Sequence, residues 1–194
     1  MHSYTAKKFN FPTLDGISEK QLEVHVALYG GYVKNLNTLQ EQIADLEKDS
    51  EKYSFAVESL NRRFGFEFNG MRMHELYFSQ WEGGGAVPTE GALGSVFAEQ
   101  GGWDVLYARF KKVGMSRGPG WTTLVWDKET SASHVAWVAD HELGTLTDVS
   151  VLLALDMWEH AYMVDYMPSE KEKYIDAFFK NLNWGVVEER FRSA

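Results

Sequence analysis

The sequence predicts an α+β protein, with an N-terminal two-helix half and a second half that combines helices with a small three-stranded antiparallel sheet. No proline occurs between Pro12 and Pro88, which favours long helices over that stretch. Three segments rich in Val, Thr and Trp, which is typical of strands, follow residue 120. Of the 194 residues, 44% are hydrophobic and 14% are aromatic, which suffices for a substantial core.

The first helix is expected to begin after Ser18, because Ser18 followed by Gln21 has the pattern of a capping box. Two adjacent glycines, Gly30 and Gly31, lie within the helical pattern. Since each costs about 1 kcal/mol in a helix interior, we expect something to come close to that surface. Apolar residues and one histidine recur at helical spacing and predict one buried face, made of Leu22, His25, Val26, Tyr29, Val33 and Leu36.

A second helical pattern ends on a face formed by His74, Tyr77, Phe78 and Trp81. The glycine run 83–85 follows it, and we place a domain boundary there. This boundary divides the chain into a helical domain of residues 1–85 and an α/β domain of residues 86–194.

The second half is expected to begin with two helical pieces in residues 91–113, separated at Gly101 and Gly102. Strands are predicted at residues 121–126, 133–138 and 149–155. Ser169 followed by Glu172 is a second capping-box pattern, which predicts a final helix running past Phe179 to about residue 191.

Composition excludes several classes of function. The chain has no cysteine, so it forms no disulfide, thiolate metal site or cysteine nucleophile. Its net charge of −9 argues against nucleic acid as a partner. No apolar run approaches the roughly 20 residues of a membrane span, and the N-terminus lacks the apolar core of a secretory signal. We therefore expect a cytoplasmic protein that binds neither nucleic acid nor membrane.

The strongest chemical feature lies where the apolar run 149–155 ends. A carboxylate at Asp156 is costly in a buried position unless a cation or a metal offsets it. His160, four residues later, can reach the same point, and an Asp and His pair suits iron, manganese or zinc. His25 and His74 lie on the apolar faces of their helices. Spacing alone leaves two alternatives open, a buried ion pair and ordinary core histidines.

With these residues, the chain resembles the iron/manganese superoxide dismutases. The resemblance runs nearly from end to end and rests on five segments in the family's order. They are LEVH at 22–25 with YVKNLN at 32–37, HELYF at 74–78, GWTTLV at 120–125, DMWEHAY at 156–162, and NW at 183–184 through RF at 190–191.

The resemblance implies a helical hairpin domain and an α/β domain with a metal between them. It assigns one iron or manganese ion per chain to His25, His74, Asp156 and His160. It also implies superoxide as a small-molecule substrate, converted to dioxygen and hydrogen peroxide by one-electron cycling of the metal.

Other motif residues receive roles from the same resemblance. Trp121 and Trp158 are expected to form an apolar wall around the metal, and Tyr77 belongs to the segment of the second ligand. Glu159 is expected to bridge to His160 of a partner subunit, which implies a homodimer or a dimer of dimers. Lys34 and Arg190 match family positions and are candidates for a local positive potential.

The sequence departs from the family around the first ligand. The family has a histidine four residues after that ligand and a gateway tyrosine eight after it, whereas here Tyr29 holds the first place and Tyr32 lies seven residues on. We expect His25, Tyr29 and Tyr32 to converge on a regular helix. The tyrosine that normally partners the missing histidine is replaced by Met163.

Two positions bear on the choice of metal. Gly70 stands where iron-type members often carry a glutamine, as manganese-type members have glycine there. His141 aligns with the outer glutamine that manganese types bring from the loop before the last strand. We expect His141 to be hydrogen-bonded to solvent on the metal and, with Tyr32, to be catalytic. This combination does not decide between iron and manganese.

Two other functions remain open at this stage. One is a metal-binding protein with the family fold and a non-enzymatic interaction role, which the missing outer histidine would permit. The other is non-haem iron chemistry with peroxide or oxygen. The latter needs an open site for a larger substrate, and the predicted aromatic wall favours a small one.

Overall fold

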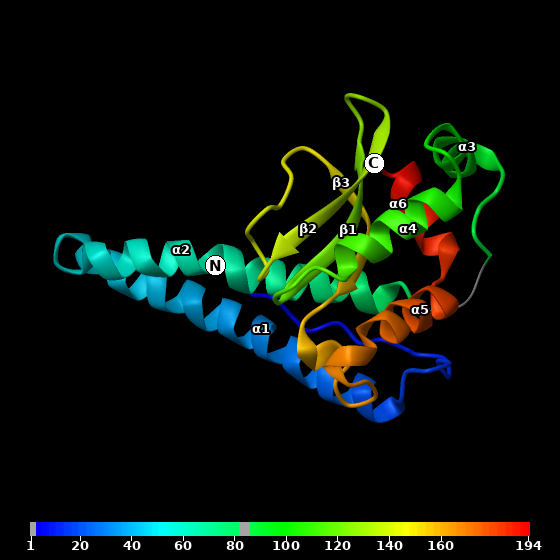
Figure 1. The fold of residues 1–194 in the computed structure, drawn as a ribbon. Helices are drawn as coiled ribbons and strands as arrows, with labels where there is room; N and C mark the ends of the chain where they lie inside the picture. The colour runs from blue at the N-terminus through cyan, green and yellow to red at the C-terminus, as the bar shows by residue number, and fades with distance from the viewer. Residues whose placement is uncertain (1–2, 82–85) are drawn as a thin grey trace.

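Two long antiparallel helices dominate the computed structural model, which describes residues 3–81 and 86–194 (Figure 1). Helix α1 (Glu19–Leu46) and helix α2 (Ser50–Ser79) are joined by the short 3-10 helix η1 (Glu47–Asp49). The remaining helices gather at the end of the hairpin opposite its tip. The expected domain boundary at residues 83–85 lies outside the described residues.

The predicted N-terminus of α1 is confirmed, but only half of the capping box forms. The Ser18 hydroxyl accepts a hydrogen bond from the backbone N–H of Gln21 at 3.1 Å. The returning bond from the Gln21 side chain is absent, because Asp165 accepts the Ser18 backbone N–H instead, at 2.7 Å. The Gln21 side chain instead donates to the carbonyl of His160, in the second half of the chain.

The expectation of a close approach at Gly30 and Gly31 is wrong. A Cβ atom at either position would meet nothing within 4 Å. Gly31 lines an open pocket between the two helices, so its Cα faces open space instead of another side chain.

The second half has the predicted mixture of helices and strands. Helix α3 (Gly91–Glu99) and helix α4 (Trp103–Gly114) are separated as expected at Gly101 and Gly102, which adopt φ values of 96° and 89° that favour glycine. Strands β1 (Gly120–Asp127), β2 (Ala132–Ala139) and β3 (Ser150–Asp156) form one antiparallel sheet in the order β2-β1-β3. The α+β fold class is therefore confirmed.

The C-terminal helix is interrupted, contrary to the prediction of one helix from Ser169 to about residue 191. Two 3-10 helices, η2 (Glu159–Ala161) and η3 (Pro168–Glu170), precede α5 (Lys171–Asn181) and α6 (Trp184–Arg192). Leu182 is extended, and the Asn183 side chain caps α6 by accepting from the N–H of Gly185 at 3.0 Å. This new cap starts a second helix rather than extending the first.

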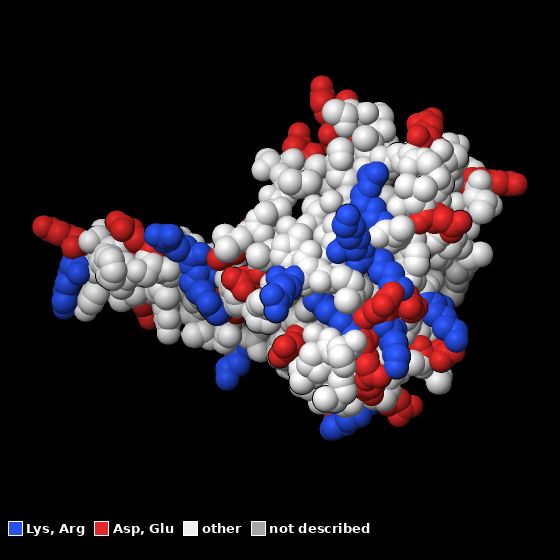
Figure 2. All heavy atoms as spheres, viewed as in Figure 1, with Lys and Arg blue, Asp and Glu red and all other residues white. Residues whose placement is uncertain are grey.

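Strand β3 packs against both α2 and α6, so it joins the hairpin to the second half. Its inner residues from Leu152 to Asp156 are buried. On the face drawn in Figure 2, Lys and Arg side chains gather over α4 and toward α5, with Asp and Glu side chains among them near α5, and charges of both signs are scattered along the hairpin. Across residues 3–81 and 86–194, no helix has the length and apolar character needed to cross a membrane.

Arg190 on α6 is hydrogen-bonded to both β3 and the end of α2. Its guanidinium donates to the carbonyls of Leu152 at 2.9 Å and Leu76 at 2.8 Å. It also donates to the hydroxyl of Ser79 at 2.8 Å and to Oε1 of Gln80 at 3.0 Å. These contacts satisfy acceptors at the C-terminal end of α2, where a helix leaves carbonyls without intrahelical partners.

We expect Arg190→Met to lower the free energy of unfolding by about 2–4 kcal/mol, because it leaves several partly buried acceptors without a donor. Urea denaturation measures this change. Arg192→Met is the matched control, since Arg192 is exposed and, within residues 3–81 and 86–194, pairs only with Glu188, at 3.6 Å on the same helix. An equal loss in the two variants would contradict the assignment.

Candidate metal centre

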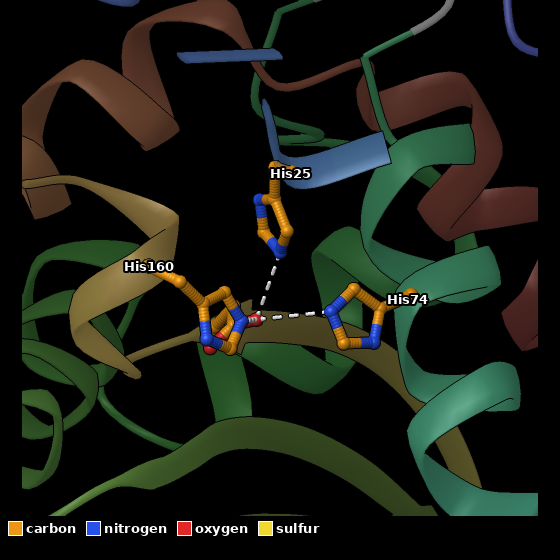
Figure 3. Close-up of side chains that lie close together, drawn as sticks. His25, His74 and His160 are labelled. Atoms are coloured by element: carbon orange, nitrogen blue, oxygen red, sulfur yellow. Dashed lines mark hydrogen bonds and ion pairs between the residues drawn. The ribbon is translucent and has the colours of Figure 1, made fainter. Parts of the chain in front are cut away.

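Four side chains from four elements meet between the two halves of the fold. His25 comes from α1, His74 from α2, Asp156 from the end of β3 and His160 from η2. One possible ligand atom from each lies within 4.8 Å of all the others. The three histidine rings point toward one another and toward a carboxylate oxygen (Figure 3).

The Asp156 carboxylate is the centre of this cluster. Its Oδ2 lies 3.1 Å from Nε2 of His25, 3.1 Å from Nε2 of His160 and 3.5 Å from Nε2 of His74. Its Oδ1 accepts the backbone N–H of Trp158 at 2.8 Å, which fixes the plane of the carboxylate. His25, His74 and Asp156 are buried, whereas the His160 side chain is 18% exposed.

Local structure explains these positions. His25 lies on the buried face of α1, one turn before Tyr29. Asp156 is the last residue of β3 and pairs with Trp121 of β1, so it is directed into the space beneath the sheet edge. The chain then turns through η2, and this 3-10 turn returns His160 to the same carboxylate.

The tautomer of His74 leaves the lone pair of its Nε2 without a hydrogen-bond donor among the described residues. Nδ1 of His74 lies 2.6 Å from the carbonyl oxygen of Gly70, so it carries the proton and donates it. In the neutral ring Nε2 is then an unprotonated acceptor, and it has no hydrogen-bond partner among the described residues. This lone pair faces a carboxylate oxygen in a buried space, an arrangement that a cation between them would stabilise.

The pKa values support neutral His25 and His74 rings beside an ionised carboxylate. Burial lowers the pKa of His25 and lowers that of His74 well below 6.5. Burial alone would raise the pKa of Asp156, but the neighbouring His160 and His25 hold it well below its usual range. Three imidazole nitrogens and one carboxylate oxygen are a donor set that suits iron, manganese and zinc.

A hydrogen-bonded chain runs beside the cluster. The indole N–H of Trp121 donates to Nδ1 of His141 at 2.9 Å, so in the neutral ring the His141 proton is on Nε2. That proton is donated to the hydroxyl oxygen of Tyr32, 2.7 Å away. His141 is fully buried, and burial lowers its pKa to about 4, which keeps the ring neutral. The His141 ring lies 6.0 Å from that of His74 between ring centres, and its expected bond to solvent on a metal stays a prediction.

Aromatic rings enclose the remaining sides. Trp158 stacks on His141 at 5.2 Å and on His160 at 5.7 Å between ring centres, and Trp121 packs edge-on against His74 at 5.1 Å. A pocket of about 450 Å³ between α1 and α2 reaches the Tyr32 ring from outside. It is lined by Leu28, Gly31, Tyr32, Asn35, Arg63, Phe66, Glu67 and Trp158.

Comparison with known proteins decides the family. Residues 90–190 match the family described as "Iron/manganese superoxide dismutases, C-terminal domain", which is more than half of the chain. The chain belongs to the iron/manganese superoxide dismutase family. The resemblance seen in the sequence is therefore confirmed.

Relatives named for each metal share most of their length with this chain. An iron superoxide dismutase of Aquifex pyrophilus is 37% identical over 93% of this chain and 87% of its own. An iron superoxide dismutase of Cupriavidus metallidurans is 32% identical over 93% and 91%, respectively. A manganese superoxide dismutase of Halobacterium salinarum is 30% identical over 92% and 88%.

The departures from the family motifs have structural counterparts. The Tyr29 ring stacks beside His74, at 6.3 Å between ring centres, but its hydroxyl is bonded to other groups. It accepts the backbone N–H of Lys7 at 2.9 Å and donates to the buried Glu75 at 3.1 Å. The hydroxyl of Tyr29 is therefore part of a hydrogen-bond network with the N-terminal segment. Of the Tyr29 side chain, only the ring lies beside the cluster.

Other predicted residues lie around the cluster without contacting the carboxylate oxygen. Glu159 and Met163 are exposed on the segment that carries His160. Tyr77 is buried, with its hydroxyl 2.8 Å from that of Tyr174, which in turn donates to the carbonyl of Asp156 at 2.9 Å.

Gly70 makes room for the Tyr32 ring. A Cβ atom at position 70 would lie 2.5 Å from Cδ1 and 2.7 Å from Cε1 of Tyr32, distances too short for any side chain. The close approach that the sequence suggested at Gly30 and Gly31 is therefore found at Gly70, on the other helix.

Several residues near the cluster gave no signal in the sequence. The guanidinium of Arg63 lies over the ring of Phe66 at 3.9 Å and pairs with Glu67 at 2.8 Å, and all three line the pocket at Tyr32. Arg190, a candidate for positive potential, instead binds acceptors at the end of α2. An amphipathic helix pattern shows which face is buried but not which charged residue borders a pocket.

We expect Gly70→Ala to lower superoxide dismutation at least about tenfold, with metal content unchanged, because the new methyl group displaces Tyr32 from His141. The measurement is activity per bound metal. Gly30→Ala is the control, since a Cβ there meets nothing and alanine favours the helix. Full activity in Gly70→Ala would show that the position of Tyr32 is unimportant.

We expect the metal-free protein to lose stability as pH falls from 6.5 toward 4. His141 has a pKa of about 4 when folded and an ordinary value of 6.5, so the unfolded chain binds more protons in this interval. The contribution of neutral His141 to the free energy of unfolding is fully present above pH 6.5 and is lost as the pH falls toward 4. Thermal melting of metal-free wild-type and His141→Gln proteins should show a weaker pH dependence in the variant. The exposed His134→Gln is the control, and equal pH dependence in all three would contradict the assignment.

Proposed function

We propose that the chain dismutates superoxide at an iron or manganese ion bound by His25, His74, Asp156 and His160. The observation that carries this proposal is the buried lone pair of His74 Nε2, which faces the Asp156 carboxylate and has no hydrogen-bond partner in the part of the chain that the structure describes. The proposal also assigns the ligands to two domains, a helical hairpin of residues 1–85 and an α/β domain of residues 86–194.

A bound iron or manganese ion would supply the one-electron chemistry, in which one superoxide is oxidised to dioxygen and a second takes up the electron and two protons to give hydrogen peroxide. The protein provides a single negative charge at Asp156 and three neutral imidazoles. The carboxylate offsets part of the charge of a cation in a space from which water is largely excluded. The surrounding tryptophans leave room only for a small substrate.

Tyr32 and His141 would act on the substrate and its protons. Since His141 donates to the Tyr32 oxygen, the hydroxyl hydrogen of Tyr32 is available to another acceptor. Burial raises the pKa of Tyr32, so the hydroxyl keeps its proton and serves as a hydrogen-bond donor. The protons consumed in the reaction must then enter from solvent, through the pocket that ends at Tyr32.

We further infer that two chains pair across the segment that carries His160. Glu159 and His160 line a pocket of about 460 Å³, together with Trp158 and Lys171. Met163, Val164 and Met167 expose apolar side chains on the same segment. Burial of these side chains by a second chain would stabilise a homodimer, and Glu159 could then accept a hydrogen bond from the ring N–H of His160 of the partner subunit, as the family motif implies. A dimer of dimers would need a second surface, because pairing across this segment uses the same patch on both chains.

We expect the wild-type chain to hold about one metal ion and to dismutate superoxide after loading with iron or with manganese. His74→Leu should lose both metal and activity, since it removes a buried nitrogen ligand. His134→Gln, an exposed histidine on β2, is the control and should retain both. Metal content and dismutation rate are measured on the same samples. Stoichiometric metal without activity would favour the non-enzymatic interaction role.

A further inference from the structure

Two buried glutamines hold the backbone of the segments that carry Asp156 and His160. Gln21 is 2% exposed and Gln80 is 0% exposed. Each lies on, or directly after, a helix that contributes a histidine to the cluster, and each uses its side-chain amide both as donor and as acceptor. Neither belongs to the cluster itself.

Gln21 connects α1 with the turn that carries His160. Its Nε2 donates to the carbonyl oxygen of His160 at 2.7 Å, and its Oε1 accepts the backbone N–H of Val164 at 3.0 Å. Gln21 precedes His25 by one helical turn, so the two side chains share a face of α1. This face of α1 thus carries His25 and also supports the backbone of His160.

Gln80 makes the corresponding connection from α2. Its Nε2 donates to the carbonyl of Ala154 at 2.8 Å, and its Oε1 accepts the N–H of Ala154 at 2.8 Å. Strand β3 is an edge strand, so this amide supplies the two bonds that a neighbouring strand would make. Ala154 lies two residues before Asp156, and Arg190 also donates to Oε1 of Gln80, at 3.0 Å.

We propose that Gln21 and Gln80 are positioning residues that fix the four donor atoms in place before a metal binds. Each glutamine ties a helix that supplies a histidine to the C-terminal segment that supplies another ligand. Together they restrict movement between the hairpin and the segments 154–156 and 160–164. This inference rests on the proposed metal centre and adds the source of its rigidity.

A preorganised cluster binds metal more tightly, because less conformational freedom is lost on binding. Groups that orient metal ligands typically change metal affinity by about 10–100-fold when they are removed. A residue that served only the stability of the fold would change the melting temperature without changing metal affinity to this degree. Affinity and stability therefore distinguish the two roles.

The test uses the full chain with Gln21→Met or Gln80→Met, which keep the side-chain length and remove the amide. Gln100→Met is the matched control. Gln100 also bonds one residue twice, donating to the carbonyl of Ser133 at 2.9 Å and accepting from its hydroxyl, but it joins the end of α3 to β2 and contacts no ligand segment. Manganese affinity is measured by chelator competition, the melting temperature on metal-free protein, and the geometry of the site by electron paramagnetic resonance of bound manganese.

We expect Gln21→Met and Gln80→Met to weaken manganese binding by about 10–100-fold and to broaden the resonance. Gln100→Met should lower the melting temperature alone. If the methionine variants do not fold, glutamate variants decide the question. Gln80→Glu should bind manganese more tightly than Gln21→Glu, because Arg190 can pair with the new carboxylate only at position 80.

Wild-type affinity in both Gln21→Met and Gln80→Met, or an equal loss in Gln100→Met, would overturn the inference while leaving the metal centre intact. A wild-type chain that binds neither iron nor manganese would overturn the metal centre itself, and the inference with it. The wild-type measurement thus separates the two failures.

Discussion

The negative charge of Asp156, placed at the buried end of β3, is the constraint on which the rest of the structure depends. An isolated carboxylate in such a place would take up a proton, and burial alone favours that outcome. His160 and His25 oppose protonation by directing ring nitrogens at one oxygen, while the other oxygen accepts the backbone N–H of Trp158. The hairpin and the sheet must therefore meet at this point for the charge to be tolerated.

The sequence predicted local structure well where a signal lies within a few residues. Both long helices, the break at Gly101 and Gly102 and the three strands follow from such signals. Spacing could not connect His25 and His74 with Asp156, because they are separated by 131 and 82 residues, and only the family motifs joined them. Gln21 illustrates the limit, since its local pattern indicated a cap but a distant segment offered its amide a buried partner.

The N-terminal segment has a larger part in this chain than its sequence suggested. Tyr29 stands where the family has a histidine, and its hydroxyl joins Lys7 and the buried Glu75. Lys7 and Arg72 both pair with Glu75, at 3.0 and 2.7 Å, so the carboxylate has two cationic partners. The contacts of Tyr29 thus hold the first residues against the hairpin, and its hydroxyl is engaged there instead of in a relay with Tyr32.

The missing side chain at Gly70 has a consequence for how this centre can diverge. Position 70 and the ring of Tyr32 compete for one volume, and Tyr32 is bonded to His141 from the opposite half of the chain. A mutation that introduces any larger residue at 70 is therefore harmful unless residues 32 and 141 change in the same lineage. Positions 32, 70 and 141 are therefore coupled, and a single replacement that enlarges residue 70 overlaps the ring of Tyr32.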